Sequence, residues 1–365
     1  MTRSCRNPEG STLYCGPDSS SARGRLIIVD EKGFRRFVRE GKRVAKGLTE
    51  ETIKSHVRTV KEFEGFLSRR SPGRRFEDAR ANDVKAFVRK LSKEGRCTFD
   101  NFIGLLRYSR FLNNVDAEQA LIVLWDGPSV LSEMCKNVEQ KYGKERSAEI
   151  LGAYRPPPVG MPPKRMPKST SDFLSRLESA VGGEGARQVL IKSPHASPPS
   201  AYADRKKAFR EAKSVDEFLR TLHESYIEEL RGYMEQGTLY FNQPINKDVL
   251  DWVKANQEIG AGVRKGNEIY CTKVPYMAIE YLREKDRTMK RYYCCHCPLA
   301  RESIPAGKEM SRNLCYCSAG YEKAPFEAAF GKPVKIRVLK AALWGDTLCR
   351  FAIEIPEGLK KRLSA

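Results

Sequence analysis

The chain has 365 residues, 40% of them hydrophobic and 31% charged, so it is long enough for two or three domains with hydrophobic cores. Its 66 Lys and Arg against 46 Asp and Glu give a net charge of +20, which favours a polyanionic partner. The longest apolar run, from Ala120 to Trp125, is far shorter than the ~20 residues of a membrane span, so we expect a cytoplasmic protein with no membrane partner.

The positive charge is concentrated near the start of the chain. Residues 21–114 carry 24 Lys and Arg against 12 Asp and Glu, whereas residues 1–20 carry two of each sign. The remaining residues carry 40 against 32. The search for a polyanion-binding surface therefore centres on the first third of the chain.

Residues 1–24 are polar and rich in Ser and Gly, which predicts a disordered leading segment containing Cys5 and Cys15. Residues 25–114 predict an all-α domain of four amphipathic helices. The first helix is expected over residues 31–44, the second after the cap residue Thr49, the third from about residue 82 to Gly95, and the fourth over residues 98–112. Basic side chains occupy their outer faces, either to bind phosphates or only to keep the bundle soluble.

Three segments of this domain carry a family resemblance: "GLTEETIKSHVRTVKEFEGFLSRR", "DVKAFVRKLSKEG" and "NFIGLLRYSRFLNN". Together they resemble the core-binding, SAM-like N-terminal domain of tyrosine recombinases and phage integrases. The resemblance implies a helical domain that clamps one side of double-stranded DNA. The basic residues expected to contact DNA, mostly at phosphates, are Lys54, Arg58, Lys61, Lys85, Arg89, Arg107 and Arg110.

The catalytic half of a tyrosine recombinase is not expected in this chain. That chemistry needs paired arginines, a His-x-x-Arg element and a tyrosine nucleophile. None of the four histidines, at positions 56, 195, 223 and 296, is followed by arginine three residues later. We therefore expect DNA binding without recombinase activity.

Residues 115–365 predict an α+β domain, with a Pro-rich linker or surface wrap at 156–170. Helices are expected over residues 116–153, 171–181, 214–236, 248–256 and 318–330, and strands over residues 268–276 and 289–295. Alternating apolar residues from Val334 to Val338 and from Phe351 to Ile355 predict a C-terminal antiparallel hairpin that turns near Gly345. The fold class is thus multidomain, with a four-helix SAM-like domain followed by an α+β domain.

A cysteine cluster, "CCHCP" at 294–298 and "CYC" at 315–317, suits zinc or, alternatively, an iron–sulfur cluster. Alternate residues on a strand point to the same side, so two C-x-C pairs on strands could converge on one metal. The favoured ligands are Cys295, Cys297, Cys315 and Cys317, with His296 and Cys294 in reserve. Reactive or ligand-binding thiols and buried structural cysteines are the alternatives.

The C-terminal segments "VRKGNEIYCTKVPY", "KRYYCCHCPLARESI", "LCYCSAGYEKAPFEAAFG" and "VLKAALWGDTLCRFAIEIP" resemble a prokaryotic family of uncharacterised, cysteine-rich proteins. The final helix and hairpin are similar to aminothiazoline-carboxylate hydrolase-like proteins, which implies a small-ligand pocket near the cysteines. The first hypothesis is a DNA-binding protein that senses a metal or ligand. The alternatives are a small-molecule hydrolase with an accessory bundle, and a module that binds RNA or an acidic protein.

Overall fold

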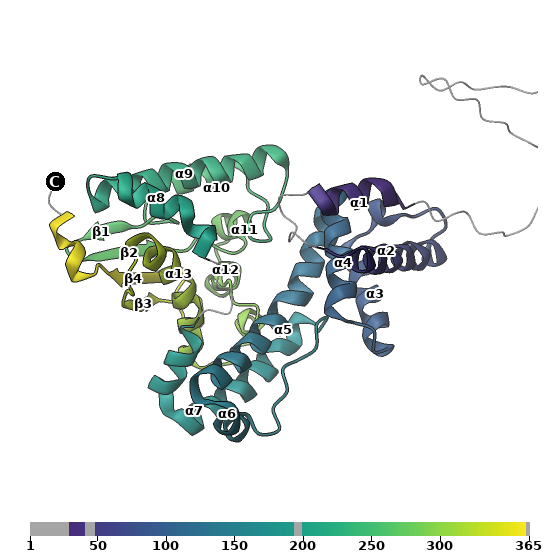
Figure 1. Cartoon of the computed structure of the whole chain (residues 1–365), viewed down its shortest axis with the longest axis horizontal. Helices are drawn as coiled ribbons and strands as arrows, with labels where there is room; N and C mark the ends of the chain where they lie inside the picture. The colour runs from purple at the N-terminus through teal and green to yellow at the C-terminus, as the bar shows by residue number, and fades with distance from the viewer. Residues whose placement is uncertain (1–28, 41–47, 193–198, 363–365) are drawn as a thin grey trace, which may run out of the picture.

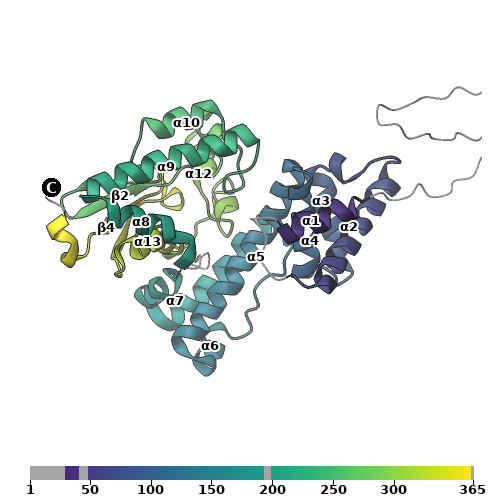
Figure 2. The same cartoon turned by 45° about the horizontal axis from the view of Figure 1, so that its top comes forward.

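The computed structural model describes residues 29–40, 48–192 and 199–362. The predicted leading segment 1–24 and the end of the first predicted helix lie outside these residues. The described helices and strands form three groups along the chain (Figure 1). They are a helical bundle, a middle group built on the second half of α5, and an α+β unit around a small sheet. Figure 2 shows the same division from a second direction.

The bundle contains α1 (Glu31–Glu40), α2 (Glu50–Arg70), α3 (Ala81–Lys93) and α4 (Phe99–Phe111), which confirms the four predicted helices. Thr49 caps α2 as expected, because its side chain accepts a hydrogen bond from the Thr52 N–H. The core consists mainly of aromatic and branched aliphatic side chains that recur at helical spacing, among them Phe34, Phe63, Phe87 and Phe102.

Helix α5 (Val115–Tyr142) belongs to two hydrophobic cores. Its first half contributes Ala117, Ala120, Leu121 and Leu124 to the core of the bundle. Its second half, from Val130 onward, packs with α6 (Lys144–Leu151) and α7 (Met166–Leu190) in a second core. The boundary predicted after residue 114 therefore precedes a helix whose first half completes the bundle.

The first part of the Pro-rich segment lies against the bundle, whereas residues 163–170 form a 3-10 turn and the start of α7. Pro128 lies inside α5 and has no N–H to donate to the carbonyl of Leu124. The Gly160 N–H donates to that carbonyl instead, at 3.0 Å, and Val159 packs on the core of the bundle. This first part thus satisfies a backbone acceptor that the proline leaves open.

The α+β unit contains a four-stranded antiparallel sheet in the order β1-β2-β4-β3. Its strands are β1 (Val263–Lys265), β2 (Glu268–Thr272), β3 (Ile336–Lys340) and β4 (Arg350–Glu354). The hairpin is confirmed, since Ile336 pairs with Ile353 and Gly345 has a positive φ in the connection. The other helices are α8 (Ala203–Glu211), α9 (Val215–Gln236), α10 (Lys247–Lys254), α11 (Ala278–Arg283), α12 (Arg287–Cys294) and α13 (Cys315–Phe330).

One strand prediction is wrong, because residues 289–295 lie in and directly after helix α12. Asp286 caps this helix by accepting a hydrogen bond from the Met289 N–H at 2.8 Å. The prediction of a strand at 268–276 holds only for β2, whose five residues end at Thr272. Strand β1 and helix α8 were not predicted.

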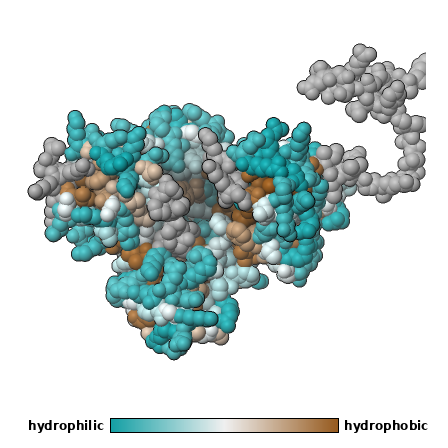
Figure 3. All heavy atoms as spheres, in the orientation of Figure 1, coloured by the Kyte–Doolittle hydropathy of each residue, from teal (hydrophilic) through white to brown (hydrophobic). Residues whose placement is uncertain are grey.

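Helices α8, α9 and α13 pack on one face of the sheet through Phe209, Phe218 and Phe330, which contact one another. On the side shown in Figure 3, hydrophilic residues cover most of the bundle's outer surface, and hydrophobic residues gather where the bundle faces the rest of the chain. In the described parts of the chain, no helix combines the length and apolar character needed to cross a membrane.

Candidate nucleic-acid interface and cysteine cluster

The outer stripe of α2 contains Lys54, Arg58 and Lys61, which are all exposed. Within the described residues, Lys54 makes no hydrogen bond or ion pair. Arg58 makes a long hydrogen bond of 3.4 Å to the Ser55 hydroxyl. Lys61 instead forms an ion pair of 2.8 Å with Glu31 of α1. The first two cations of the stripe are therefore available to an anionic partner.

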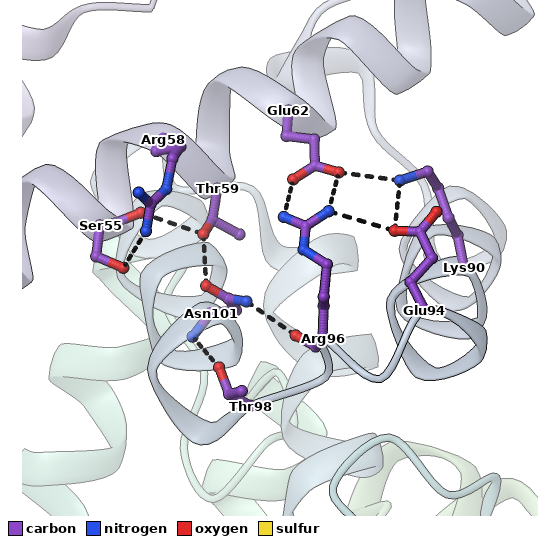
Figure 4. Close-up of polar contacts among 9 residues, drawn as sticks. All are labelled: Ser55, Arg58, Thr59, Glu62, Lys90, Glu94, Arg96, Thr98 and Asn101. Atoms are coloured by element: carbon purple, nitrogen blue, oxygen red, sulfur yellow. Dashed lines mark hydrogen bonds and ion pairs between the residues drawn. The ribbon is translucent and has the colours of Figure 1, made fainter.

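The N-terminus of α4 lies beside this stripe (Figure 4). Thr98 caps α4 by accepting a hydrogen bond from the Asn101 N–H. The Asn101 side chain accepts a hydrogen bond from the Thr59 hydroxyl at 2.9 Å and donates one to the Arg96 carbonyl at 2.8 Å. These bonds fix the start of α4 against α2, next to Arg58.

A buried histidine joins the same two helices further along. The His56 ring nitrogens lie 3.1 Å from Asp100 and 3.4 Å from Arg107, both on α4. Burial lowers the pKa of His56, and the Asp100 carboxylate opposes that shift. The neutral ring therefore donates from Nε2 to Asp100 and accepts at Nδ1 from Arg107. Arg107 is half-buried by this contact and is less accessible to DNA than the resemblance implied.

Next to the interface, two cations and two acids form a compact network (Figure 4). Glu62 of α2 forms ion pairs with Arg96 at 2.6 Å and with Lys90 at 2.9 Å. Glu94 forms ion pairs with the same two cations. The Arg96 and Lys90 hydrogen bonds lower the pKa of Glu62 to about 2. The network has no net charge, so it positions the segment between α3 and α4 and adds little attraction for phosphate.

Helix α3 carries a second stripe of exposed cations: Lys85, Arg89 and Lys93. They follow one another at four-residue intervals, which places them on one face of the helix about 6 Å apart along its axis. Within the part of the chain that the structure describes, none of the three forms a hydrogen bond or ion pair. Lys93 was not among the predicted contacts, although its spacing from Lys85 and Arg89 could have identified it.

The seven predicted contacts therefore fall into two sets. Lys54, Arg58, Lys85 and Arg89 are exposed and lack an acidic partner within the described residues. The other three are held by the protein itself: Lys61 by Glu31, Arg110 by Glu118 at 2.6 Å, and Arg107 by the buried His56.

The five cysteines of the cluster lie around the end of α12 and the start of α13, and a sixth cysteine, Cys349, directly precedes β4. Cys315 and Cys317 occupy the first turn of α13, where residues two apart point about 200° away from each other. The strand geometry behind the predicted convergence is therefore absent at this pair. Among the described side chains, no three His, Cys, Asp or Glu residues are placed to hold a metal ion together. Metal binding by Cys295, Cys297, Cys315 and Cys317 stays a prediction.

Burial keeps most of these thiols protonated, since it raises the pKa of Cys297 and of Cys317 to about 12. Cys349 differs, because its thiol accepts hydrogen bonds from the Cys294 thiol and, at 3.5 Å, from the Ala342 N–H. The Cys294 bond is the main cause of a lowered pKa at Cys349. The cluster defined from the sequence, at 294–298 and 315–317, does not include Cys349.

Two groups beside the cysteines make contacts that the sequence did not predict. His296 donates from Nε2 to the Val274 carbonyl at 2.6 Å, so only its other ring nitrogen is available as a ligand. Arg301 is buried and lies over the Tyr276 ring, with 4.2 Å from the guanidinium carbon to the ring centre. Its Nε and Nη1 have no hydrogen-bond partner among the described atoms.

Two family models match the chain. Residues 40–112 match the phage integrase N-terminal SAM-like domain. Residues 273–359 match a family of unknown function, DUF6144. No curated protein and no solved structure matches the chain.

The integrase-like match spans α2, α3 and α4, and so includes both basic stripes and the Glu62 network. It confirms the resemblance stated for the first third of the chain. The DUF6144 match spans the five cysteines of the cluster together with Cys349 and assigns them no role. The similarity to aminothiazoline-carboxylate hydrolase-like proteins has no support from these matches and stays a prediction.

Proposed function

We propose that the integrase-like domain binds double-stranded DNA through the basic stripes of α2 and α3. The observation that carries this proposal is the set of five exposed cations, Lys54, Arg58, Lys85, Arg89 and Lys93, that have no acidic partner among the described residues. The match of this region to an integrase domain supports the choice of DNA over other polyanions.

Physically, these side chains suit phosphates better than base edges. Lysine and arginine on exposed helix faces neutralise phosphates and release counterions, which gives affinity with little sequence information. The start of α4 adds a helix N-terminus beside Arg58, and the positive end of a helix dipole also favours phosphate. We therefore expect binding that is strong at low salt and weakly dependent on sequence.

A duplex is favoured over a single strand because the bundle offers few rings for base stacking. Among the described residues, its aromatic side chains are buried or half-buried except Phe99, which is 58% exposed at the start of α4. A preference for single-stranded DNA that is lost in a Phe99→Ala variant would contradict the duplex proposal.

The salt dependence of binding tests the proposal. Five phosphate contacts predict that the logarithm of the association constant of the full chain for a random-sequence duplex falls with the logarithm of salt concentration at a slope of about −4 to −5. Fluorescence anisotropy over a salt series measures this slope. A flat response would remove the proposal.

Two double variants separate direct contact from net charge. Replacing Lys54 and Arg58 by Gln should reduce the steepness of the slope by about 2 and weaken binding by about eightfold per contact at 0.1 M salt. Replacing Lys61 and Arg110 by Gln removes the same charge from residues that already have acidic partners. The second variant should keep most of the slope. Equal losses in both would mean that only the overall charge matters.

For the C-terminal half, metal or ligand sensing and the alternative hydrolase activity remain predictions. Elemental analysis of the purified protein tests the metal hypothesis directly. A zinc site would give about one zinc ion per chain, whereas an iron–sulfur cluster would give iron together with sulfide. A Cys315→Ser variant with unchanged metal content would rule out the four-cysteine set as the site.

A further inference from the structure

We propose that Cys294 and Cys349 form a reversible disulfide, which makes the DUF6144-like region a thiol redox site. This inference is independent of DNA binding by the first third of the chain. Cys349 packs against the same small core that contains Cys294, with the two thiols in hydrogen-bonding reach of each other, although 54 residues separate them in the sequence.

The backbone holds both cysteines against one segment. The Tyr276 N–H donates to the Cys294 carbonyl at 3.4 Å, and the Met277 N–H donates to the Tyr293 carbonyl at 2.9 Å. On the other side, the Lys273 N–H donates to the Cys349 carbonyl at 3.0 Å. Because the end of α12 and the residue before β4 are both bonded to residues 273–277, the backbone holds the two cysteines near each other.

The surroundings make the pair unequal. Cys294 is fully buried, whereas Cys349 is half-buried. A cavity of about 270 Å³ is lined by Arg287, Lys340, Asp346, Thr347 and Leu348, and Leu348 directly precedes Cys349 in the chain. Because Cys349 is the more exposed of the two cysteines, a small oxidant reaches it first, and Cys294 is the thiol that resolves the product.

The chemistry balances with hydrogen peroxide as the oxidant. The Cys349 thiol attacks the peroxide O–O bond and becomes a sulfenic acid, with release of water. The Cys294 sulfur then attacks the sulfenic sulfur, the S–O bond breaks, and a second water leaves with the Cys294 proton. Two thiols have lost two electrons and two protons to the peroxide, and a dithiol reductant reverses the change.

Peptide mapping tests this pairing in the full chain. Trypsin cleavage after Arg291, Arg301, Lys340 and Arg350 places Cys349 as the sole cysteine of peptide 341–350, and Cys294 in peptide 292–301 with Cys295 and Cys297. Cys315 and Cys317 fall in a separate peptide, 313–323. After brief peroxide treatment and alkylation, we expect peptide 341–350 linked to 292–301, with fragmentation assigning the bond to Cys294 and dithiothreitol releasing both.

Linkage of 341–350 to 313–323, assignment of the bond to Cys295 or Cys297, or no linked peptide at all would overturn the proposal. In a Cys349→Ser variant the linked peptide should disappear, and in a Cys135→Ser control, which removes a thiol from the middle core, it should persist. If Cys349→Ser does not fold, the wild-type map alone decides. Duplex binding is measured on the same preparation, so that a missing disulfide and a failure to bind DNA are observed separately.

Discussion

Single ion pairs decide which basic side chains are free to bind DNA. Lys54 and Lys61 lie on the same helix and look equivalent in the sequence, yet only Lys61 meets an acid, supplied by α1. Arg110 likewise meets Glu118 of α5. The sequence could show that outer positions of the helices are basic, but the partners come from other elements, so packing decides which charges are neutralised.

Glu62 offers a direct test of the network beside the interface. Its pKa is lowered from 4.5 to about 2, so its stabilising contribution is fully present above about pH 4.5 and is lost as the pH falls toward 2. Replacing Glu62 by Gln should lower the free energy of unfolding by about 2–3 kcal/mol at pH 7. Urea unfolding at pH 7 and at pH 3 measures this, and the difference from wild type should shrink at pH 3.

Glu77 supplies the control, because its side chain is exposed and forms no ion pair among the described residues. Glu77→Gln should change the free energy of unfolding by less than about 0.5 kcal/mol at either pH. A Glu62→Gln effect as small as the control, or one that grows as the pH falls, would contradict the role given to the network.

The approach of α4 to α2 depends on a glycine at the helix crossing. A Cβ atom added at Gly104 would lie 3.0 Å from the Cα of His56, too close for a normal contact with backbone. The sequence showed Gly104 inside a helical pattern but could not show what it faces. The same close approach buries His56 and aligns it with Asp100 and Arg107.

Gly104→Ala should therefore destabilise the bundle by about 1–3 kcal/mol, because α2 and α4 must move apart. Gly232 in α9 is the matched helical control, since the nearest atom to its added Cβ is a flexible Gln236 side chain at 3.8 Å. Gly232→Ala should be neutral or stabilise by up to about 1 kcal/mol. Thermal or urea unfolding measures both, and equal effects of the two variants would remove the packing explanation.

Elements with a long apolar stripe were predictable, and short elements near the cysteines were not. The four helices of the bundle and the C-terminal hairpin follow from periods of 3.6 and 2. The eight-residue helix α12 was predicted as a strand because Tyr292, Tyr293 and the cysteines favour strands locally. The cap at Asp286 was the available signal for a helix. The expectation that the C-x-C pairs converge required both pairs to be extended, whereas Cys315 and Cys317 lie in the first turn of α13.

On the scale of the whole molecule, α5 sets the true limit of the bundle. A fragment of residues 25–114 lacks Leu121 and Leu124, whose burial contributes about 1.5–3 kcal/mol each. We expect this fragment to be unfolded or about 3–6 kcal/mol less stable than a fragment of residues 25–126. Circular dichroism during thermal unfolding compares the two. Equal cooperative transitions would show that the bundle is complete without α5.

The continuity of α5 also fixes an angular relation between the basic stripes and the sheet-containing unit. An α-helix turns by about 100° and rises by about 1.5 Å for each residue. A single residue inserted near Gly127 would therefore rotate one end of the molecule against the other, whereas a flexible tether would absorb it. The number of residues in this helix therefore sets the rotational orientation of a partner bound to the bundle relative to the cysteine-rich end of the molecule.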